Sequence, residues 1–407
     1  MAHSSIKQRK KDIASATAAL PTSSSSSSST ETKNVISTSS SSSINSKNKT
    51  NPLVPLPLIA IVCLCSGSLW MLALRDLFRT GQVILGPMDE QMLQFTHSTD
   101  WYDSSRGWWK STQGGFSAIQ SITTDANNMG GFFVRKLTGA ASLIVHSQKL
   151  FPLLFSSSNI NWSEGHYDPL VCTAIVGNIA LILFYLSYQT VFIQANANTM
   201  SLYIISVSMI EALSMMGYLI HRWFTTTRNI SKPTIIKYPM GKNASSLVSN
   251  IVARTVGIIT ALMILIASRD LFFPGQEIGF PPMDDIYLEW TGAFIHSPPP
   301  GSIEEQEYSL EAPLHIGDLF ISQLCALYIL IFCFQKLIAA FGIRYGIYGQ
   351  GLYQCLVFWK IQSIGDGLLL LVFRAFASSA KSASLDVRWH LMCLGYEACI
   401  LALYGYF

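Results

Sequence analysis

Long apolar stretches alternate with polar segments along most of the chain. Seven of them approach or exceed the length of about 20 residues with which a helix crosses a bilayer. They are 54–78, 169–194 and 199–222 in the first half and 247–272, 315–340, 350–376 and 387–407 in the second. Because a helix satisfies its own backbone hydrogen bonds in lipid, the pattern predicts an all-α, polytopic integral membrane protein.

One phrase occurs twice, as RDLFRTGQVILGPMDE at 75–90 and as RDLFFPGQEIGFPPMDD at 269–285. Further matches follow in the same order, all at an offset of about 186 to 195 residues. They are QKL at 148–150 and 335–337, VGN at 176–178 with IGD at 364–366, and MIEA at 209–212 with GYEA at 395–398. An ordered series at a nearly constant offset indicates a tandem duplication. We therefore predict two parallel four-helix membrane repeats, at 53–224 and 246–407.

The duplication also predicts a helix that hydropathy alone misses. The first-half partner of 315–340 is 131–155, which carries Arg135, Lys136, His146 and Lys149. We expect this segment to be a buried, protein-facing helix, which brings the total to about eight membrane spans. The alternative is an amphipathic helix that lies in the membrane interface.

Charge and composition outside the spans predict the topology. The first 52 residues are rich in Ser and Thr and basic, so we expect a disordered cytosolic tail. A basic linker at 225–245 separates the repeats, and the positive-inside rule places it in the cytosol too. Both termini are then cytosolic, and two outer loops, about 80–130 and an acidic one at about 273–314, lie on the other side. The expected location is the plasma membrane or an endomembrane.

Overall composition excludes several classes of protein. Half of the residues are hydrophobic, 13% are charged and mean hydropathy is +0.34, which a soluble domain of this length rarely shows. The net charge of +3 is spread over the tail and the loops rather than one face, so nucleic acid is not an expected partner. The eight cysteines lie in or beside apolar stretches, and no Cys/His spacing predicts a metal site. The sequence indicates neither a cofactor nor an oligomeric state.

Polar residues within the predicted spans are the first candidates for function, because a charge inside a bilayer is costly and faces a bundle interior or water. These intramembrane candidates are Glu211, Glu397, Asp366, Asn178 and His390. Glu211 and Glu397 share one repeat position, and either a satisfied hydrogen bond between helices or a proton or cation site would explain them. Lys149 and Lys336 lie towards the cytosolic ends of their helices, where we expect their long side chains to snorkel.

The repeated phrase ends the first helix of each repeat at the outer face. Six of its ionisable residues form an outer-mouth motif, namely Arg75, Asp76, Asp89, Arg269, Asp270 and Asp284. One interpretation is interface anchoring and helix capping, with the Gly and Pro-Met-Asp positions turning the chain. The other is a paired charge gate at the outer mouth.

Three classes of function are compatible with these features. Transport of a small solute or cation is the preferred hypothesis, with Glu211, Glu397 and Asp366 near the middle of the membrane. A non-catalytic subunit or assembly protein would instead bind a protein partner through the outer loops. A membrane-embedded enzyme acting on a lipid or isoprenoid would use Glu397, Asp366 and His390 as acid and base groups, although no catalytic signature is present.

Overall fold

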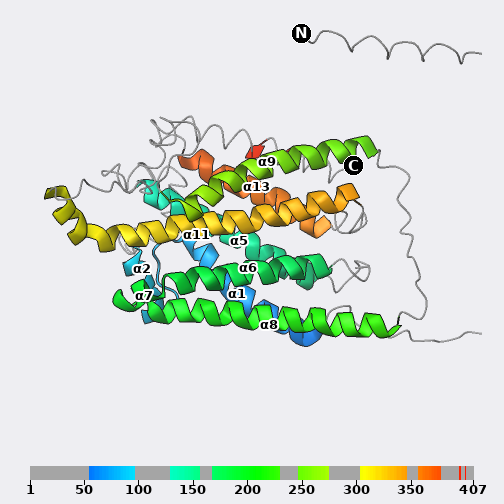
Figure 1. Ribbon diagram of the computed structural model, residues 1–407, viewed down its shortest axis with the longest axis horizontal. Helices are drawn as coiled ribbons and strands as arrows, with labels where there is room; N and C mark the ends of the chain where they lie inside the picture. The colour runs from blue at the N-terminus through cyan, green and yellow to red at the C-terminus, as the bar shows by residue number, and fades with distance from the viewer. Residues whose placement is uncertain are drawn as a thin grey trace, which may run out of the picture. The chain divides into compact units, whose positions relative to one another are not determined.

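The computed structural model (Figure 1) describes residues 55–96, 129–155, 167–229, 246–274, 303–345, 356–376, 394–395 and 399. These residues contain helices and no strand. The helices are α1 (Leu56–Phe78), α2 (Pro87–Phe95), α5 (Met129–Phe155), α6 (Tyr167–Ser187), α7 (Gln189–Gln194), α8 (Asn198–Asn229), α9 (Ser246–Phe272), α11 (Ile303–Tyr345) and α13 (Leu356–Phe376). The predicted tail at 1–52 and much of the basic linker and of both outer loops lie outside the described residues.

Most predicted helices coincide with observed ones. The segments 54–78, 131–155, 199–222, 247–272 and 350–376 correspond to α1, α5, α8, α9 and α13. The segment 169–194 is not one helix, because it is divided at Tyr188 into α6 and α7. Helix α11 begins at Ile303 rather than near 315, so its first turns occupy part of the acidic loop. Of the predicted last helix, 387–407, the described residues are 394–395 and 399.

The loop after α1 contains a helix where the sequence predicts a turn. Gly86 has a φ of 68°, a conformation that glycine adopts without steric penalty, and it reverses the chain just before Pro87. Proline then occupies the first helical position of α2, where its missing N–H is no loss and its fixed φ suits the helix. The Gly-Pro pair therefore starts α2 instead of only turning the chain.

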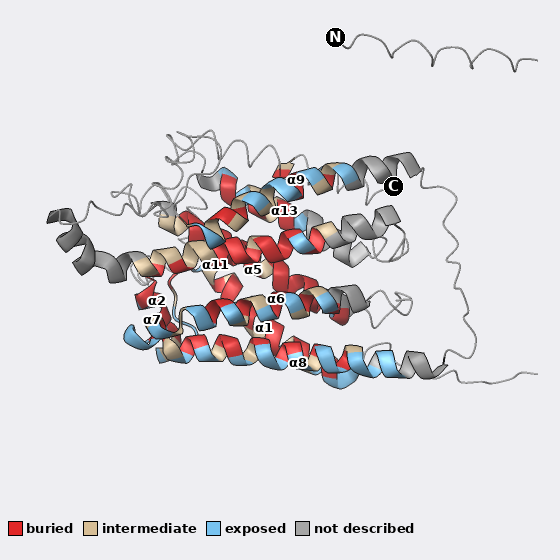
Figure 2. Cartoon of the chain, viewed as in Figure 1, coloured by how far each residue is buried: buried red, intermediate tan, exposed pale blue. Residues whose placement is uncertain are grey.

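Four segments are long and apolar enough to cross a membrane. They are Leu56–Phe78 of α1, Asn198–His221 of α8, Arg254–Phe272 of α9 and Ile316–Leu337 of α11. Large apolar side chains on these helices face outward, among them Leu64, Leu213 and Leu265, and Figure 2 shows exposed residues along the outer sides of α8 and α9. Exposed apolar surface of this extent is unfavourable in water and suited to lipid. These features indicate a membrane protein.

Helix α5 is enclosed by other helices. It packs against α1, α6, α11 and α13, and among its described side chains only Leu154 is exposed. Figure 2 shows buried residues along its length. A helix lying along a membrane surface would keep a polar face in contact with water. Most of its described residues are thus buried against other helices, as expected for a protein-facing helix.

Helices α5 and α11 pack against each other and run in the same direction. Arg135 Nη2 of α5 lies 3.9 Å from Asp318 Oδ1 of α11, and further along both helices the ring of His146 meets that of Tyr328. Helix α11 also contacts a glycine of α6 from the first half, and helix α5 contacts a glycine of α13 from the second half. A Cβ atom on Gly177 of α6 would lie 3.1 Å from Ile331 of α11, and one on Gly365 of α13 would lie 2.9 Å from Ile144 of α5.

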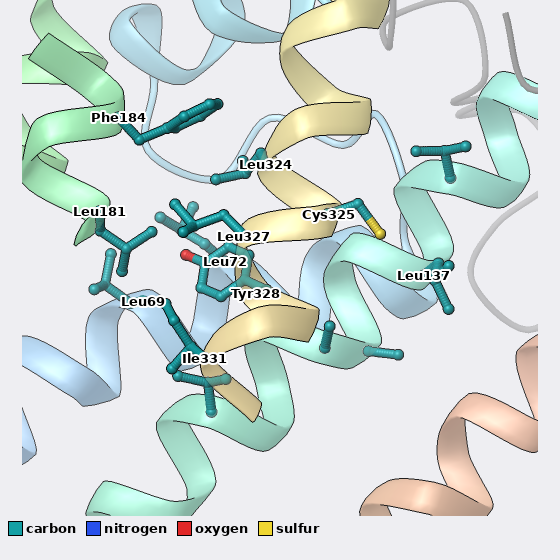
Figure 3. Packing of buried hydrophobic residues seen from close by; sticks show 14 of the residues in the cluster. Leu69, Leu72, Leu137, Leu181, Phe184, Leu324, Cys325, Leu327, Tyr328 and Ile331 are labelled. Carbon is teal, nitrogen blue, oxygen red and sulfur yellow. The ribbon is translucent and has the colours of Figure 1, made fainter. Parts of the chain in front are cut away.

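One hydrophobic cluster joins the two halves of the chain. It includes residues of α1, α5, α6, α8, α11 and α13. In the part of it that Figure 3 shows, Tyr328 of α11 lies among Leu69 and Leu72 of α1 and Leu181 of α6. The halves therefore share a core, which fixes the polar groups described below.

Replacing Gly139 with alanine is expected to destabilise the protein by about 1–3 kcal/mol, because overpacking forces helices apart. A Cβ atom at Gly139 of α5 would lie 2.7 Å from the Leu77 backbone nitrogen of α1. The matched control is Gly217→Ala in α8, where the added methyl meets no atom within 4 Å and helix propensity favours alanine. Free energies of unfolding in mixed micelles would test the pair. Equal effects of the two substitutions would contradict the close α1–α5 contact.

Candidate functional site

Four polar side chains from four helices meet in the interior of the first half. Lys149 of α5 donates from Nζ to Asn178 Oδ1 of α6 at 2.6 Å and to Glu211 Oε2 of α8 at 3.0 Å. Asn178 Nδ2 donates to the same Glu211 oxygen at 3.0 Å, and Ser66 Oγ of α1 donates to Glu211 Oε1. We call these residues the buried tetrad.

The buried tetrad is shielded from solvent and its formal charge is zero. Glu211, Asn178 and Ser66 have no exposed surface, and Lys149 is 4% exposed. An isolated charge at such a depth would cost several kcal/mol, and each charge here offsets that cost for the other. Asn178 is oriented by the pair, since its carbonyl accepts from the cation and its amide donates to the anion. The arrangement can hold a proton or small cation if the pair separates.

A second buried ion pair lies in the second half. Lys336 of α11 donates from Nζ to Asp366 Oδ1 of α13, and both residues are buried. The ammonium group of Lys336 also lies 4.3 Å from the centre of the Phe332 ring. Lys336 and Asp366 stand at the repeat positions of Lys149 and Asn178, so a lysine bonds its partner on the next long helix in both halves.

The snorkelling interpretation of Lys149 and Lys336 is wrong. Both side chains turn into the bundle and form ion pairs there instead of extending to a membrane surface. A lysine stem reaches either way along a helix, and the buried carboxylates of Glu211 and Asp366 provide a stronger partner than a distant interface. Sequence reasoning also missed Ser66, because one serine in an apolar helix carries no distinctive signal.

The first copy of the outer-mouth motif forms a closed charge network. Arg75 donates from Nε to Asp76 Oδ1 at 2.7 Å and from Nη1 to Asp89 Oδ1. Asp89 is fully buried, and its other oxygen accepts from the backbone N–H of Ile84 at 2.9 Å and more weakly from that of Leu85 at 3.5 Å. The network ties the end of α1 to the loop and to the first turn of α2.

The second copy repeats part of this geometry. Arg269 Nε donates to Asp270 Oδ1 at 2.8 Å, as Arg75 does to Asp76. A neighbouring contact recurs as well, because Lys136 Nζ donates to the Leu77 carbonyl at 2.6 Å and Gln323 Nε2 to the Leu271 carbonyl at 2.8 Å. Asp284, the counterpart of Asp89, lies outside the described residues.

A cavity of about 70 Å³ lies beside the Arg75 network. Its polar lining includes Arg75, Asp76, Arg135, Thr138 and Ser142, and apolar residues of α1, α2, α8 and α11 complete it. Arg135 Nη1 donates to Thr96 Oγ1, another lining residue, at 2.8 Å. A cavity of this size and polarity can hold several water molecules or one small solute.

Two of the predicted candidates, Glu397 and His390, lie outside the described residues. The enzyme hypothesis rests largely on these two residues. Within the described ranges, no group of three or more His, Cys, Asp or Glu side chains could hold a metal ion. The structure thus brings together Glu211 with Asn178, and Arg75 with Asp76 and Asp89, and it pairs Asp366 with Lys336.

The described fold and site define an all-helical membrane protein with ion pairs buried between its helices. No protein-family model, curated protein or solved structure matches the chain.

Proposed function

We propose that the protein transports a small solute or cation. The observation that carries this proposal is the buried tetrad, in which Lys149 and Glu211 form an ion pair between helices of a membrane protein. An ion pair of this kind is weak support for stability, because apolar residues of similar volume often stabilise a buried site equally well. Ionisable groups at membrane depth commonly mark ion and substrate pathways.

The proposed architecture is eight spans in two parallel four-helix repeats, with both termini in the cytosol. Equivalent contacts support the repeats, namely Lys136 with Leu77 and Gln323 with Leu271, and Gly177 with Ile331 and Gly365 with Ile144. The common direction of α5 and α11 supports the parallel arrangement. In transporters built from parallel repeats, the site lies between helices near the middle of the bilayer, which suits the position of the buried tetrad.

One face of α5 supports a route between the cavity and the buried tetrad. Arg135, Thr138 and Ser142 line the cavity, and Lys149 follows two turns after Ser142. Successive residues in this series are three, four and seven positions apart, and such spacings place them on one face of a helix. A solute or ion in the cavity therefore has polar groups along α5 on its way to Glu211. In the proposed orientation the cavity is at the outer end.

The test compares the wild-type chain with the double variant Lys149→Met/Glu211→Met in proteoliposomes. Currents on a solid-supported membrane are recorded after jumps in Na⁺, K⁺ or pH. We expect a current from the wild type and at least a tenfold smaller one from the double variant, which should still fold because it removes both charges together. Equal currents from the two proteins would contradict a transport role for the pair.

A second candidate function is that of a non-catalytic membrane subunit. It is favoured by the internal pairing of the buried tetrad, because a scaffold also needs its buried charges neutralised. Native mass spectrometry of the chain purified in mild detergent from its source membrane separates the two candidates. A stoichiometric protein partner together with silent proteoliposomes would favour the subunit, and a particle without a partner that gives ion currents would favour the transporter.

A further inference from the structure

His146 is a fully buried histidine that the buried tetrad does not use. It lies on α5 and has no exposed surface. Neither ring nitrogen has a hydrogen-bond partner among the described residues. Its ring meets that of Tyr328 on α11 edge-on, with ring centres 6.0 Å apart and an interplanar angle of 71°.

An imidazole in this position costs free energy that an apolar residue would not. Neutral imidazole carries one N–H donor and one acceptor nitrogen. Leaving a buried polar atom unsatisfied costs about 1–3 kcal/mol. Both ring nitrogens therefore favour a hydrogen bond to a small polar molecule such as water. The same two ends allow the ring to take a proton on one nitrogen and to release one from the other.

Along α5, His146 lies between Ser142, which lines the cavity, and Lys149 of the buried tetrad. Ser142, one turn before it, and Tyr328, which touches its ring, both line the cavity. Lys149, three residues after it, is on an adjacent part of the same helix face. The distance along α5 from Ser142 to Lys149 is about 10.5 Å, and His146 is in the middle of that interval.

We infer that His146 is a proton relay between the cavity and Glu211. The transported ion is then the proton, and its path runs through the first half of the protein. The inference rests on the proposed transport function and names its ion. A hydrated proton that enters the cavity binds the ring nitrogen that carries no hydrogen and leaves a neutral water molecule behind, and the ring becomes an imidazolium. The proton on the other nitrogen then leaves towards the Glu211 carboxylate, directly or through water, and the ring is neutral again. Rotation of the ring then restores the starting tautomer, so that the nitrogen without a hydrogen faces the cavity again before the next proton binds.

Proteoliposomes that contain the full chain and an internal pH dye test this relay under a potassium diffusion potential set with valinomycin. The variants are His146→Gln, which keeps a polar side chain without a titratable ring, and His146→Ala, which leaves space for added imidazole. Val145→Ala is the matched control, because Val145 is a buried neighbour on α5 without a polar group. Size-exclusion profiles and thermal midpoints establish that each variant is folded.

We expect proton uptake to fall at least tenfold in both His146 variants, while Val145→Ala stays within twofold of the wild type. External imidazole should partly restore His146→Ala and leave Val145→Ala and empty liposomes at their own rates. Proton uptake by His146→Gln at the wild-type rate would overturn the relay but would not contradict the transport function. A Na⁺ or K⁺ current that depends on Glu211 and occurs without proton uptake would likewise overturn the relay without contradicting the transport function. Wild-type liposomes that conduct none of these ions would overturn both the relay and the transport of cations.

Discussion

Replacing Glu211 with glutamine is expected to lower the free energy of unfolding by about 3–5 kcal/mol, because it leaves the Lys149 ammonium buried without a counter-charge. Glutamine preserves the shape of the side chain and still bonds Asn178 and Ser66. The loss therefore reports the charge itself. Unfolding in mixed micelles, followed by tryptophan fluorescence, would measure it.

A double-mutant cycle tests the origin of that loss. Lys149→Met and Glu211→Met alone should each destabilise the protein by a similar amount, and Lys149→Met/Glu211→Met should recover most of the stability, giving a large coupling energy. Glu90→Gln, an exposed carboxylate on α2, serves as a control and should stay within about 0.5 kcal/mol of the wild type. Additive effects of the two single substitutions would show that Lys149 and Glu211 are not paired.

Replacing Asp89 with alanine is expected to cost about 3–5 kcal/mol, the second of the two largest effects. The substitution removes one carboxylate from Arg75 and leaves the Ile84 and Leu85 amides without their acceptor. The loss of the buried ion pair and the loss of the hydrogen-bond acceptor for these amides both contribute. Asp89→Asn should cost less, because its side-chain oxygen still accepts from the Ile84 amide.

The same unfolding assay checks this effect, and Glu90→Ala is the adjacent control on α2. Limited proteolysis provides a second readout, because loosening of the loop at 79–86 should make it more susceptible. If Asp89→Ala and Glu90→Ala behaved alike, the closed network at the end of α1 would be contradicted.

Helix positions were largely predictable from the sequence, since the long apolar stretches give the ends of α1 and α9 to within two residues. The ordered series of repeat matches was also informative for α5, because Lys149 and Lys336 share a position and hydropathy alone rejects the charged segment. The start of α2 was not predicted, because Gly86 and Pro87 favour a turn and a helix start equally well.

The buried tetrad was predictable only in part. Glu211 and Asn178 are polar residues in apolar helices, so the cost of burial identifies them. The sequence does not show which residues they bind, because the residues opposite a helix face are known only from the packing of the helices. Lys149 was misinterpreted for this reason. His146 was passed over because a histidine beside other polar residues has no spacing signal.

Synthesis of the chain imposes an order on how its first half enters the bilayer. In the proposed topology α5 is a span, yet Arg135, Lys136 and Lys149 each oppose insertion, because a basic residue costs up to about 3.5 kcal/mol at a helix centre and less towards the ends. The groups that neutralise or bind Lys149 come later, since Asn178 is 29 residues and Glu211 is 62 residues downstream. A nascent chain that ends before α8 holds this ammonium without its carboxylate. In that topology α1, α5, α6 and α8 therefore become stable in lipid as a group after α8 is made, rather than one helix at a time.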